Sequence, residues 1–506
     1  MGDDDDDLQD RFARYVVSPK VLEDLQGGGE QSASIRRGGS PNRIGGRAVA
    51  ERRSRMIVEL NAGYPGGLDA ARSAVMQSLV AFGVDDVRAM RAERVRSRYH
   101  VFIELSLAEL EALPVGEGER FPIRKVWPDE ALTALLDRSV RTIKADACLT
   151  AFGADGDGIV VAVADSGIEA HHPHFARYRN LDLPAGLTHV DMTEGDEAPL
   201  SDGFGHGTHI AGIVAGTMDG ATSEVRRVRR VRDERGTVRT VVDEVADGRP
   251  LRGVAPKCKL LSLKVLDDAG EGHVSLLIAA LERVEGFNEG GRELRVHCVN
   301  LSLGYPFDPE WYAAGHSPLC VTVNRLSRSG VVVVAAAGND GSALQQTEGR
   351  SGRQRVGIGQ SINDPGNAQE AITVGSTHGD SPHMYGVSHF SSRGPTADGR
   401  AKPDMVAPGE RIVSCAAACS AKLADVLDED WTPQEGVAYF REDSGTSMAA
   451  AHVSGAVASL LSIRREFIGR PEVVKDVLMG SCIDLKRNSD FQGAGLLDLM
   501  RAIQAV

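Results

Sequence analysis

Length, composition and charge narrow the classes of protein to which this chain of 506 residues can belong. Such a length allows two or three globular units and a large core. The 57 Lys and Arg residues against 71 Asp and Glu give a formal net charge of −14, which argues against general binding to nucleic acid or to an anionic membrane. No apolar run is long enough to predict a membrane span, and the start, MGDDDDDLQD, lacks the basic and apolar parts of a secretory signal.

The cysteines indicate a reducing compartment. Their number is odd and they are scattered over a large chain, which predicts free, buried thiols in a cytoplasmic protein rather than a disulfide framework. Cys415 and Cys419 form the only close pair, and because the second half of a zinc site is missing, packing in the core is favoured over metal binding. The seven are Cys148, Cys258, Cys298, Cys320, Cys415, Cys419 and Cys482.

The N-terminal part of the chain divides into a tail, a small domain and a linker. Residues 1–50 are rich in Gly, Ser and charge and are predicted to be disordered, because they cannot build a core. Residues 51–128 follow the order βαββαβ, which predicts a separate ferredoxin-like domain. Its segments are MIVEL, LDAARSAVMQSLVAFG, two strands in VRAMRAERVRSRYHVFIEL, the helix SLAELEALP and the strand IRKVW. Residues 129–147 are expected to be a linker.

From residue 148 to residue 506 the predicted strands become apolar throughout and alternate with helices. They lack the alternation of strands that have one face in water, so we expect a mostly parallel sheet buried on both faces, in a three-layer α/β domain. In such sheets the active residues gather beyond the carboxyl ends of the strands. The predicted strands are IVVAVAD, KLLSLKVL, VHCVNLSLG, GVVVVAAAGN and AITVGST.

Three polar residues stand at the ends of strands or the start of a helix in this domain. Asp165 ends IVVAVADSG, His206 begins the apolar helix in GHGTHIAGIVAG, and Asn339 ends VVVVAAAGN. Taken alone, Asp165 and Asn339 are equally compatible with turns. Zinc binding by His206 and His209 is disfavoured, because the glutamate of a zincin motif is missing between them.

The stretch DSGTSMAAAHVSG adds a serine hydroxyl to this set. Gly445 permits a tight turn and Thr446 can cap a helix, so Ser447 is expected at a helix N-terminus, where free N–H groups favour a developing negative charge. A capped, closely packed helix is the alternative interpretation of this motif by itself. A hydroxyl, an imidazole, a carboxylate and an amide together are the set that acyl transfer requires.

Several ordered segments resemble the signature segments of the subtilisin-like serine peptidases, the subtilases. They are VAVADSGIEAHHPHF, GHGTHIAGIVAG, VNLSLG, VVVVAAAGND, MVAPG, SGTSMAAAHVSG and FQGAGLLDLMRAI, and they run from about residue 145 to the C-terminus. The resemblance implies a serine endopeptidase that hydrolyses peptide bonds through an acyl-enzyme. It implies that Ser447 is the nucleophile, His206 the general base, and Asp165 the carboxylate that orients His206. It places Asn339 and the N–H of Ser447 in the oxyanion hole, and leaves His209 a packing role.

The resemblance also implies how the substrate and the N-terminal domain bind. An extended peptide is expected to pair with Ser302, Leu303 and Gly304 and with Ala336, Ala337 and Gly338, whose small side chains predict an uncharged specificity pocket. Residues 51–128 resemble the prodomain of the family, which implies an intramolecular inhibitor that is cut off by autoprocessing between about residues 126 and 147. The partners are then a protein or peptide substrate and this domain, and neither a metal nor a cofactor is expected.

Two features depart from the family pattern. Residues 219–250 insert a charged segment that is predicted to form a β-hairpin around Arg235 and Gly236, and no calcium ligand set is visible in it. Ala451 stands where the family usually has proline, which predicts a change in the turn that carries Ser447. Two alternative functions remain open: a dedicated processing or peptide-ligating enzyme for one partner, and a catalytically silent module that binds peptides.

Overall fold

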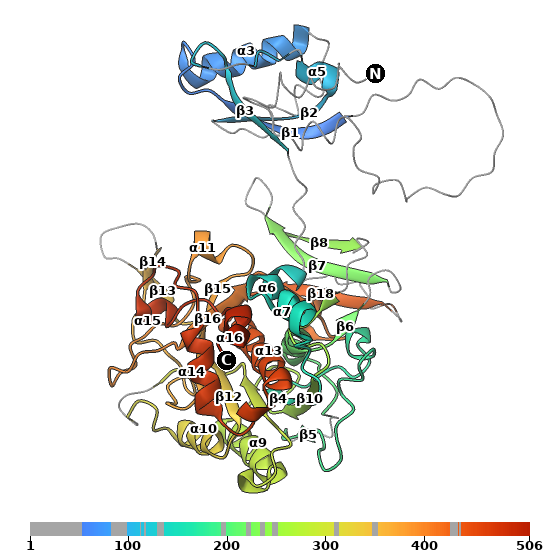
Figure 1. Ribbon diagram of the computed structural model, residues 1–506, viewed down its shortest axis with the longest axis vertical. Helices are drawn as coiled ribbons and strands as arrows, with labels where there is room; N and C mark the ends of the chain where they lie inside the picture. The colour runs from blue at the N-terminus through green and yellow to red at the C-terminus, as the bar shows by residue number, and fades with distance from the viewer. Residues whose placement is uncertain are drawn as a thin grey trace, which may run out of the picture. The chain divides into compact units, whose positions relative to one another are not determined.

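The computed structural model divides the chain into two compact units, Met1–Thr133 and Ala134–Val506. The structure describes residues 53–81, 99–111, 113–115, 118–128, 136–193, 199–218, 224–232, 238–244, 251–307, 313–346, 353–425, 434 and 437–506. The N-terminal tail 1–50, for which disorder is predicted, lies outside these ranges. Figure 1 labels the elements of both units.

The described part of the first unit is a three-stranded antiparallel sheet with the order β2-β1-β3 and two helices. At the start of the helix expected in SLAELEALP, the backbone N–H of Ser106 donates to the Glu109 carboxylate at 2.9 Å and the N–H of Glu109 donates to the Ser106 hydroxyl at 3.3 Å, so the two residues cap this helix. The additional strand expected in VRAMRAERV lies outside the described residues, so the ferredoxin-like order stays a prediction. The elements are β1 (Arg53–Leu60), α3 (Gly67–Ala81), β2 (His100–Ser106), α5 (Leu107–Glu111) and β3 (Ile123–Pro128).

The second unit is built on a seven-stranded parallel sheet with the order β16-β15-β12-β11-β4-β10-β5. All five apolar strands predicted from the sequence are present in it, and β5 and β16 add an edge strand on each side. The strands are β4 (Val160–Asp165), β5 (Val190–Asp191), β10 (Lys259–Lys264), β11 (Cys298–Leu301), β12 (Val332–Ala336), β15 (Ile372–His378) and β16 (Met405–Glu410).

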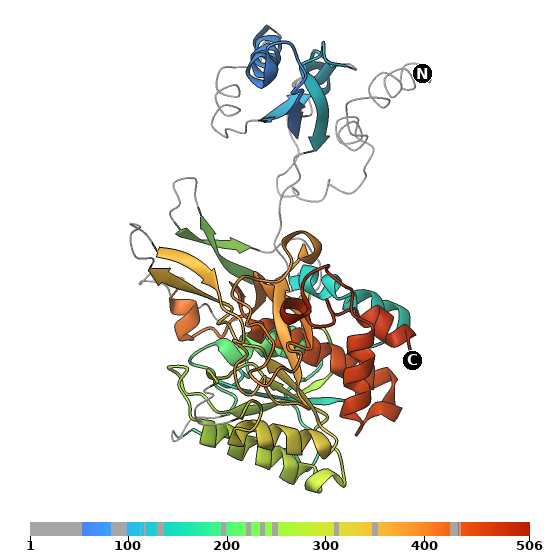
Figure 2. The same cartoon turned by 90° about the vertical axis from the view of Figure 1, so that its left-hand side faces the viewer.

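Helices cover both faces of this sheet, as the apolar strands predict. Alternate residues of β4 enter two separate cores, Val161 and Val163 on one face and Ala162 and Ala164 on the other. Two helices pack on the second face, α9 (Val274–Phe287) and α10 (Pro318–Arg328), and Figure 2 shows them side by side. The first face is covered by α7 (Ala145–Phe152), α8 (His206–Val214), α13 (Thr446–Ile463), α14 (Pro471–Gly480) and α16 (Leu499–Gln504).

One helix corrects the expectation that no segment has the length and apolar character of a membrane span. Helix α13 is 18 residues long and apolar enough to pass such a test, but 89% of that window is buried inside the protein. Its apolar side chains are therefore used in the core of the second unit, where they pack against the sheet and against α8.

A second, four-stranded sheet has the order β17-β18-β7-β8. Strands β7 (Val225–Arg232) and β8 (Val238–Glu244) pair antiparallel, which confirms the predicted hairpin, while its turn at 233–237 lies outside the described residues. Strand β7 also pairs in parallel with β18 (Ala438–Asp443), which in turn pairs with β17 (Ile412–Cys415). The insertion therefore extends a sheet whose strand β18 runs directly into helix α13.

The segment expected to be a linker, 129–147, contains helical structure in its second half. Helix α6 (Leu136–Thr142) and the start of α7 belong to the second unit, and Ser139 on α6 hydrogen-bonds through its hydroxyl to Nε2 of His452 on α13 at 2.9 Å. The smaller elements are β6 (Thr217–Met218), β9 (Leu251–Arg252), β13 (Ser342–Gln346), β14 (Arg353–Gly357), α11 (Pro382–Tyr385), α12 (Ala421–Ala424) and α15 (Ser489–Gln492), with short 3-10 turns at Pro173–Phe175, Glu289–Gly291 and Arg465–Phe467.

All seven cysteines are free thiols, as predicted. Five are buried and Cys482 is half-buried, but Cys419 is exposed, so the expectation that Cys415 and Cys419 both pack in the core is wrong for the second. Burial raises the pKa of the Cys258 thiol well above its ordinary value and that of the Cys298 thiol to about 12, which keeps both thiols neutral.

Candidate active site

Asp165 and His206 meet at the carboxyl edge of the parallel sheet. Asp165 is the last residue of β4 and is fully buried, and His206 is the first residue of α8. Nδ1 of His206 lies 2.8 Å from Oδ1 and 2.9 Å from Oδ2 of Asp165. A carboxylate in this place fixes the imidazole with a proton on Nδ1 and leaves Nε2 as the basic nitrogen.

A buried polar network holds this pair in place. The backbone N–H of Ser166 donates to Asp165 at 2.8 Å, and the hydroxyl of Ser166 donates to Oδ1 of Asp202 at 2.8 Å. Asp202 also accepts the N–H groups of Gly205 at 2.7 Å and Thr208 at 2.8 Å. Burial raises the pKa of Asp202, while these hydrogen bonds act in the opposite direction.

The sequence reasoning did not select Asp202, although a signal was present. In SDGFGHGTH an aspartate precedes the start of a helix by four residues, and such an aspartate can accept the free N–H groups of the first turn. Gly167 is also required here, because its φ of +106° is left-handed and a Cβ would lie 1.9 Å from the carbonyl oxygen of Ser201.

Ser447 is the second residue of α13, at the helix N-terminus predicted for it. Its hydroxyl donates to the backbone carbonyl of Ser302 at 2.8 Å, and the hydroxyl of Ser302 donates to the carbonyl of Ser447 at 2.9 Å. In the described part of the chain, the hydroxyl of Ser447 therefore donates to the backbone of Ser302 and not to His206. The Ser302 hydroxyl is itself held by Nδ2 of Asn300 at 2.7 Å.

Thr446 does not cap the helix in the predicted way. Helix α13 begins at Thr446, with Gly445 before it in extended conformation. Oδ1 of Asn339 accepts the backbone N–H of Thr446 at 3.0 Å and its hydroxyl at 3.1 Å, so Asn339 takes the place of the cap. Because Oδ1 is occupied in this way, the Nδ2 group of Asn339 is the part left to act as a donor.

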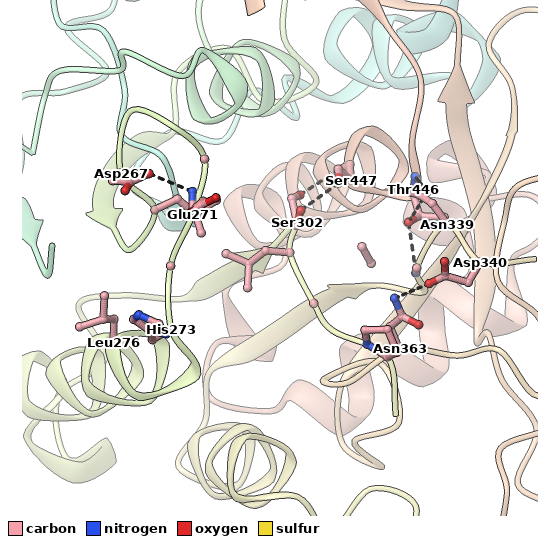
Figure 3. Close-up of a pocket in the computed structure, with 18 of the residues that line it drawn as sticks. Asp267, Glu271, His273, Leu276, Ser302, Asn339, Asp340, Asn363, Thr446 and Ser447 are labelled. Atoms are coloured by element: carbon pink, nitrogen blue, oxygen red, sulfur yellow. Dashed lines mark hydrogen bonds between the residues drawn. The ribbon is translucent and has the colours of Figure 1, made fainter. Parts of the chain in front are cut away.

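A cleft of about 1010 Å³ opens beside Ser447, and Figure 3 shows its lining. Of the residues expected to bind substrate, Ser302, Leu303, Gly304, Ala336 and Gly338 line this cleft together with Asn339 and Ser447. Ala337 is not among the lining residues, because it is fully buried and pairs through its N–H with the carbonyl of Val374 at 3.0 Å. Asp340 also lines the cleft, which differs from the expectation of an uncharged pocket.

Arg441 on β18 connects the strand that leads to Ser447 with the helix that begins at His206. Its side chain is 5% exposed and donates to the carbonyl of Gly205 at 3.1 Å and to Asp443 at 2.6 Å. The backbone carbonyl of Arg441 lies 3.2 Å from Nε2 of His209, which is fully buried and packs inside the protein. Burial lowers the pKa of His209. Burial acts to raise the pKa of Asp443, but Arg441, His209 and Lys422 together hold it well below its ordinary value.

No site for a metal ion is apparent in the described ranges of the chain, where no group of three or more His, Cys, Asp or Glu side chains has a suitable arrangement. One ring nitrogen of each histidine in the disfavoured zinc pair is engaged elsewhere, Nδ1 of His206 with Asp165 and Nε2 of His209 with the carbonyl of Arg441.

Comparison with known proteins finds a family and relatives to which the chain is similar. The family model described as "Subtilase family" matches residues 156–495. The chain is 29% identical to the serine protease AprX of Bacillus subtilis (strain 168) over 391 residues, which cover 75% of this chain and 74% of that protein. It is 27% identical to subtilisin E of the same organism, covering 83% and 85% of the two chains. It is 30% identical to the major intracellular serine protease of that organism, over 66% of this chain and 78% of that protein.

Proposed function

Because the chain belongs to the subtilase family and is a subtilisin-like serine endopeptidase, we propose that Asp165, His206 and Ser447 form its catalytic triad. The observation that carries this proposal is the pairing of His206 with buried Asp165 at 2.8 Å, on the same sheet edge as a cleft lined by Ser447. A hydroxyl nucleophile needs a base that is itself oriented by a third group, and this pair supplies both.

Acylation begins with a rotation of the Ser447 side chain. Its hydroxyl leaves the carbonyl of Ser302 by turning about the Cα–Cβ bond and then donates to Nε2 of His206. As Oγ attacks the substrate carbonyl carbon, Nε2 takes the proton, and Asp165 stabilises the imidazolium. His206 then gives this proton to the leaving amine, which completes the acyl-enzyme. In deacylation a water molecule loses a proton to His206 and attacks the acyl carbon, the ester bond to Oγ of Ser447 breaks, the carboxylic acid product leaves, and His206 returns the proton to Oγ.

The negative charge that develops on the substrate oxygen is stabilised by two donors. These are the Nδ2 group of Asn339 and the backbone N–H of Ser447 in the first turn of α13. The support for Asn339 is that its Oδ1 is held by Thr446, which fixes the amide orientation before the substrate binds. Such preorganisation is effective because no donor has to move when the charge appears.

Labelling and substitution together test the triad. A fluorophosphonate is expected to form an adduct on Ser447 of the wild-type protein, identified by peptide mass spectrometry, and none on Ser447→Ala. Peptide hydrolysis by Ser447→Ala should fall by at least about 10⁴-fold. A wild-type protein that neither reacts with the label nor cleaves a denatured protein would favour the alternative of a silent peptide-binding module.

We further propose that the enzyme is made as a self-processed zymogen, with residues 51–128 as the inhibitor. In support, the described part of the first unit has its own core, built from the sheet and α3. Since residues 136–147 are folded into the second unit, the cut is expected at 129–135 rather than later. The intact mass of the wild-type protein and of Ser447→Ala after long incubation tests this. Equal, uncut masses would contradict autoprocessing, and failure of the isolated domain to inhibit would contradict the inhibitor role.

A cytoplasmic location and metal-independent activity complete the proposal. The free cysteines support the first, and one relative of the chain is named an intracellular serine protease in Paenibacillus polymyxa. Activity should survive a chelator, because the proposed triad needs no metal ion to activate Ser447. Complete inactivation by a chelator that added metal reverses would contradict the metal-free mechanism. A dedicated processing or ligating role is distinguished by cleavage of one sequence only in a peptide library.

A further inference from the structure

One wall of the cleft ends in a hydrogen-bonded pair of polar side chains, Asp340 and Asn363. Asp340 follows directly after Asn339, and Asn363 lies against the end of β12, where its backbone N–H donates to the carbonyl of Ala337 at 2.9 Å. A Cβ on Gly338 would lie 2.7 Å from Cγ of Asn363. The Asn363 side chain therefore closes the space beside Gly338, within reach of a substrate side chain that enters next to Ser447.

The pair presents hydrogen-bond acceptors to this space. Nδ2 of Asn363 donates to Oδ2 of Asp340 at 2.9 Å, and the backbone N–H of Asp340 is held by the hydroxyl of Ser392 at 3.0 Å. With its Nδ2 directed at Asp340, Asn363 has its Oδ1 acceptor left, and Asp340 has its Oδ1 and a full negative charge. Such a surface suits a side chain that carries donors and a positive charge, and it disfavours a carboxylate.

The rest of the cleft has the same sign of charge. The described lining contains the carboxylates of Asp267, Glu271 and Asp340 and neither Lys nor Arg, while His273 is its one histidine. Figure 3 shows Asp267 and Glu271 across the cleft from Asp340, with Ser302 between them. Oδ1 of Asp267 accepts the N–H groups of Ala269 and Glu271, both at 2.9 Å, whereas Glu271 is exposed. A cleft lined by one sign of charge concentrates substrates of the opposite sign.

We propose that the enzyme selects polypeptides with Lys or Arg immediately before the scissile bond, and that Asp340 is the residue that determines this preference. The proposal rests on the proposed function, because it takes Ser447 as the nucleophile and the space beside Gly338 as the pocket for that side chain. The ammonium or guanidinium group binds the free oxygens of Asp340 and Asn363. The apolar stem packs against the small walls formed by Ala336, Gly338 and Gly304.

The first experiment maps cleavage sites in a denatured protein of known sequence by mass spectrometry. Lys and Arg are expected to be enriched before the cut bonds, and enrichment of apolar residues instead would overturn the proposal. The second compares two peptides that differ only in having Lys or norleucine before the scissile bond, so that the stem is nearly the same and the charge is not. The wild-type ratio of kcat/KM should favour Lys by about fivefold or more, the size expected for a partly exposed ion pair.

Substitutions then assign the preference to a residue. In Asp340→Asn the ratio of kcat/KM for the Lys peptide to that for the norleucine peptide should fall about fivefold. A higher salt concentration should also lower this ratio for the wild type, because salt screens the ion pair. Glu472→Gln removes the same charge from the exposed surface of α14, and its ratio should equal that of the wild type. Glu271→Gln removes a charge from the opposite wall. If Glu271→Gln abolishes the preference and Asp340→Asn does not, the assignment to Asp340 is wrong.

Fluorophosphonate labelling separates failure of this inference from failure of the proposed function. If Ser447 is labelled and peptides are cut without preference for Lys or Arg, the inference fails and the proposed function stands. If Ser447 is not labelled and no bond is cut, the proposed function fails, and the inference falls with it. Asp340→Asn should still react with the label, which shows that a change in its ratio does not come from loss of the nucleophile.

Discussion

The two sides of the active site differ in how far their polar groups are already satisfied. On one side, Asp165 is fully buried and bonded to His206 and Ser166, and Asp202 behind it accepts three groups from the protein. On the other side, Asn339 is exposed, its Oδ1 accepts the N–H of Thr446, and its Nδ2 group is the donor that we propose for the substrate oxygen. In the proposed mechanism, therefore, the groups that orient the base have their hydrogen-bond partners within the protein, while the group that meets the substrate gains its partner only on binding.

The largest expected effect lies on the buried side. Asp165→Asn keeps the size of the side chain but offers an amide where His206 needs an acceptor, so the imidazole is held in the wrong tautomer. We expect kcat to fall by about 10⁴-fold with little change in KM. Steady-state kinetics on one peptide substrate measures this, and circular dichroism serves as the control for folding. A fall of less than tenfold would show that the buried network does not set the tautomer.

On the exposed side, loss of the amide donor of Asn339 is expected to lower kcat about 10²- to 10³-fold. Asn339→Asp keeps an acceptor for Thr446 and loses the donor, whereas Asn339→Leu loses both. If stabilisation of the oxyanion is the main role, the two variants should be similarly slow. If only Asn339→Leu is slow, the contribution of Asn339 is to hold the start of α13, and the contrast between the two sides is weaker than proposed.

Arg441 joins the two sides, and its removal should have an intermediate effect. Arg441→Met keeps the apolar stem but loses the bonds to Gly205 and Asp443, so α8 and the strand before Ser447 lose a common support. We expect kcat to fall about tenfold, since small displacements of reacting groups are costly, with KM little changed.

Two controls accompany Arg441→Met. Arg470→Met removes an exposed arginine at the start of α14 and should behave as the wild type. Arg441→Lys should restore part of kcat, because a single ammonium can replace one of the two bonds. An effect on thermal unfolding without any effect on kcat would assign Arg441 to stability alone.

The smallest expected effect concerns Ala451, which is fully buried in α13. A proline here has no N–H for the carbonyl of Ser447, which already accepts the hydroxyl of Ser302 at 2.9 Å. In Ala451→Pro we expect a change of severalfold in the partition of the acyl-enzyme between water and an added amine, as shifts near 1 Å alter rates up to about 10²-fold. Ser302→Ala removes the hydroxyl that donates to the carbonyl of Ser447, and it should change this partition more than Ala451→Pro does. Equal ratios of hydrolysis to aminolysis in wild type and Ala451→Pro would show that Ala451 is silent.

Local sequence patterns predicted the five inner strands of the central sheet, but not the two edge strands β5 and β16. The apolar runs ending at Asp165 and Asn339 specify buried parallel strands, because only a sheet covered on both faces has no polar alternation. The hairpin β7–β8 was also predictable, since alternation around a glycine turn is a local signal. These features depend on neighbours within a few residues, and so they can be read from the chain directly.

Tertiary structure alone decided which polar groups meet. Arg441 and Gly205 are 236 residues apart in sequence and bond at 3.1 Å, and Ser302 and Ser447 are 145 residues apart and exchange two hydrogen bonds. Likewise, Asn363 reaches Asp340 only because the chain that follows the paired strands β13 and β14 returns to the end of β12. The physical reason is that a hydrogen bond depends on distances of about 3 Å and on direction, and neither composition nor periodicity carries that information between distant segments.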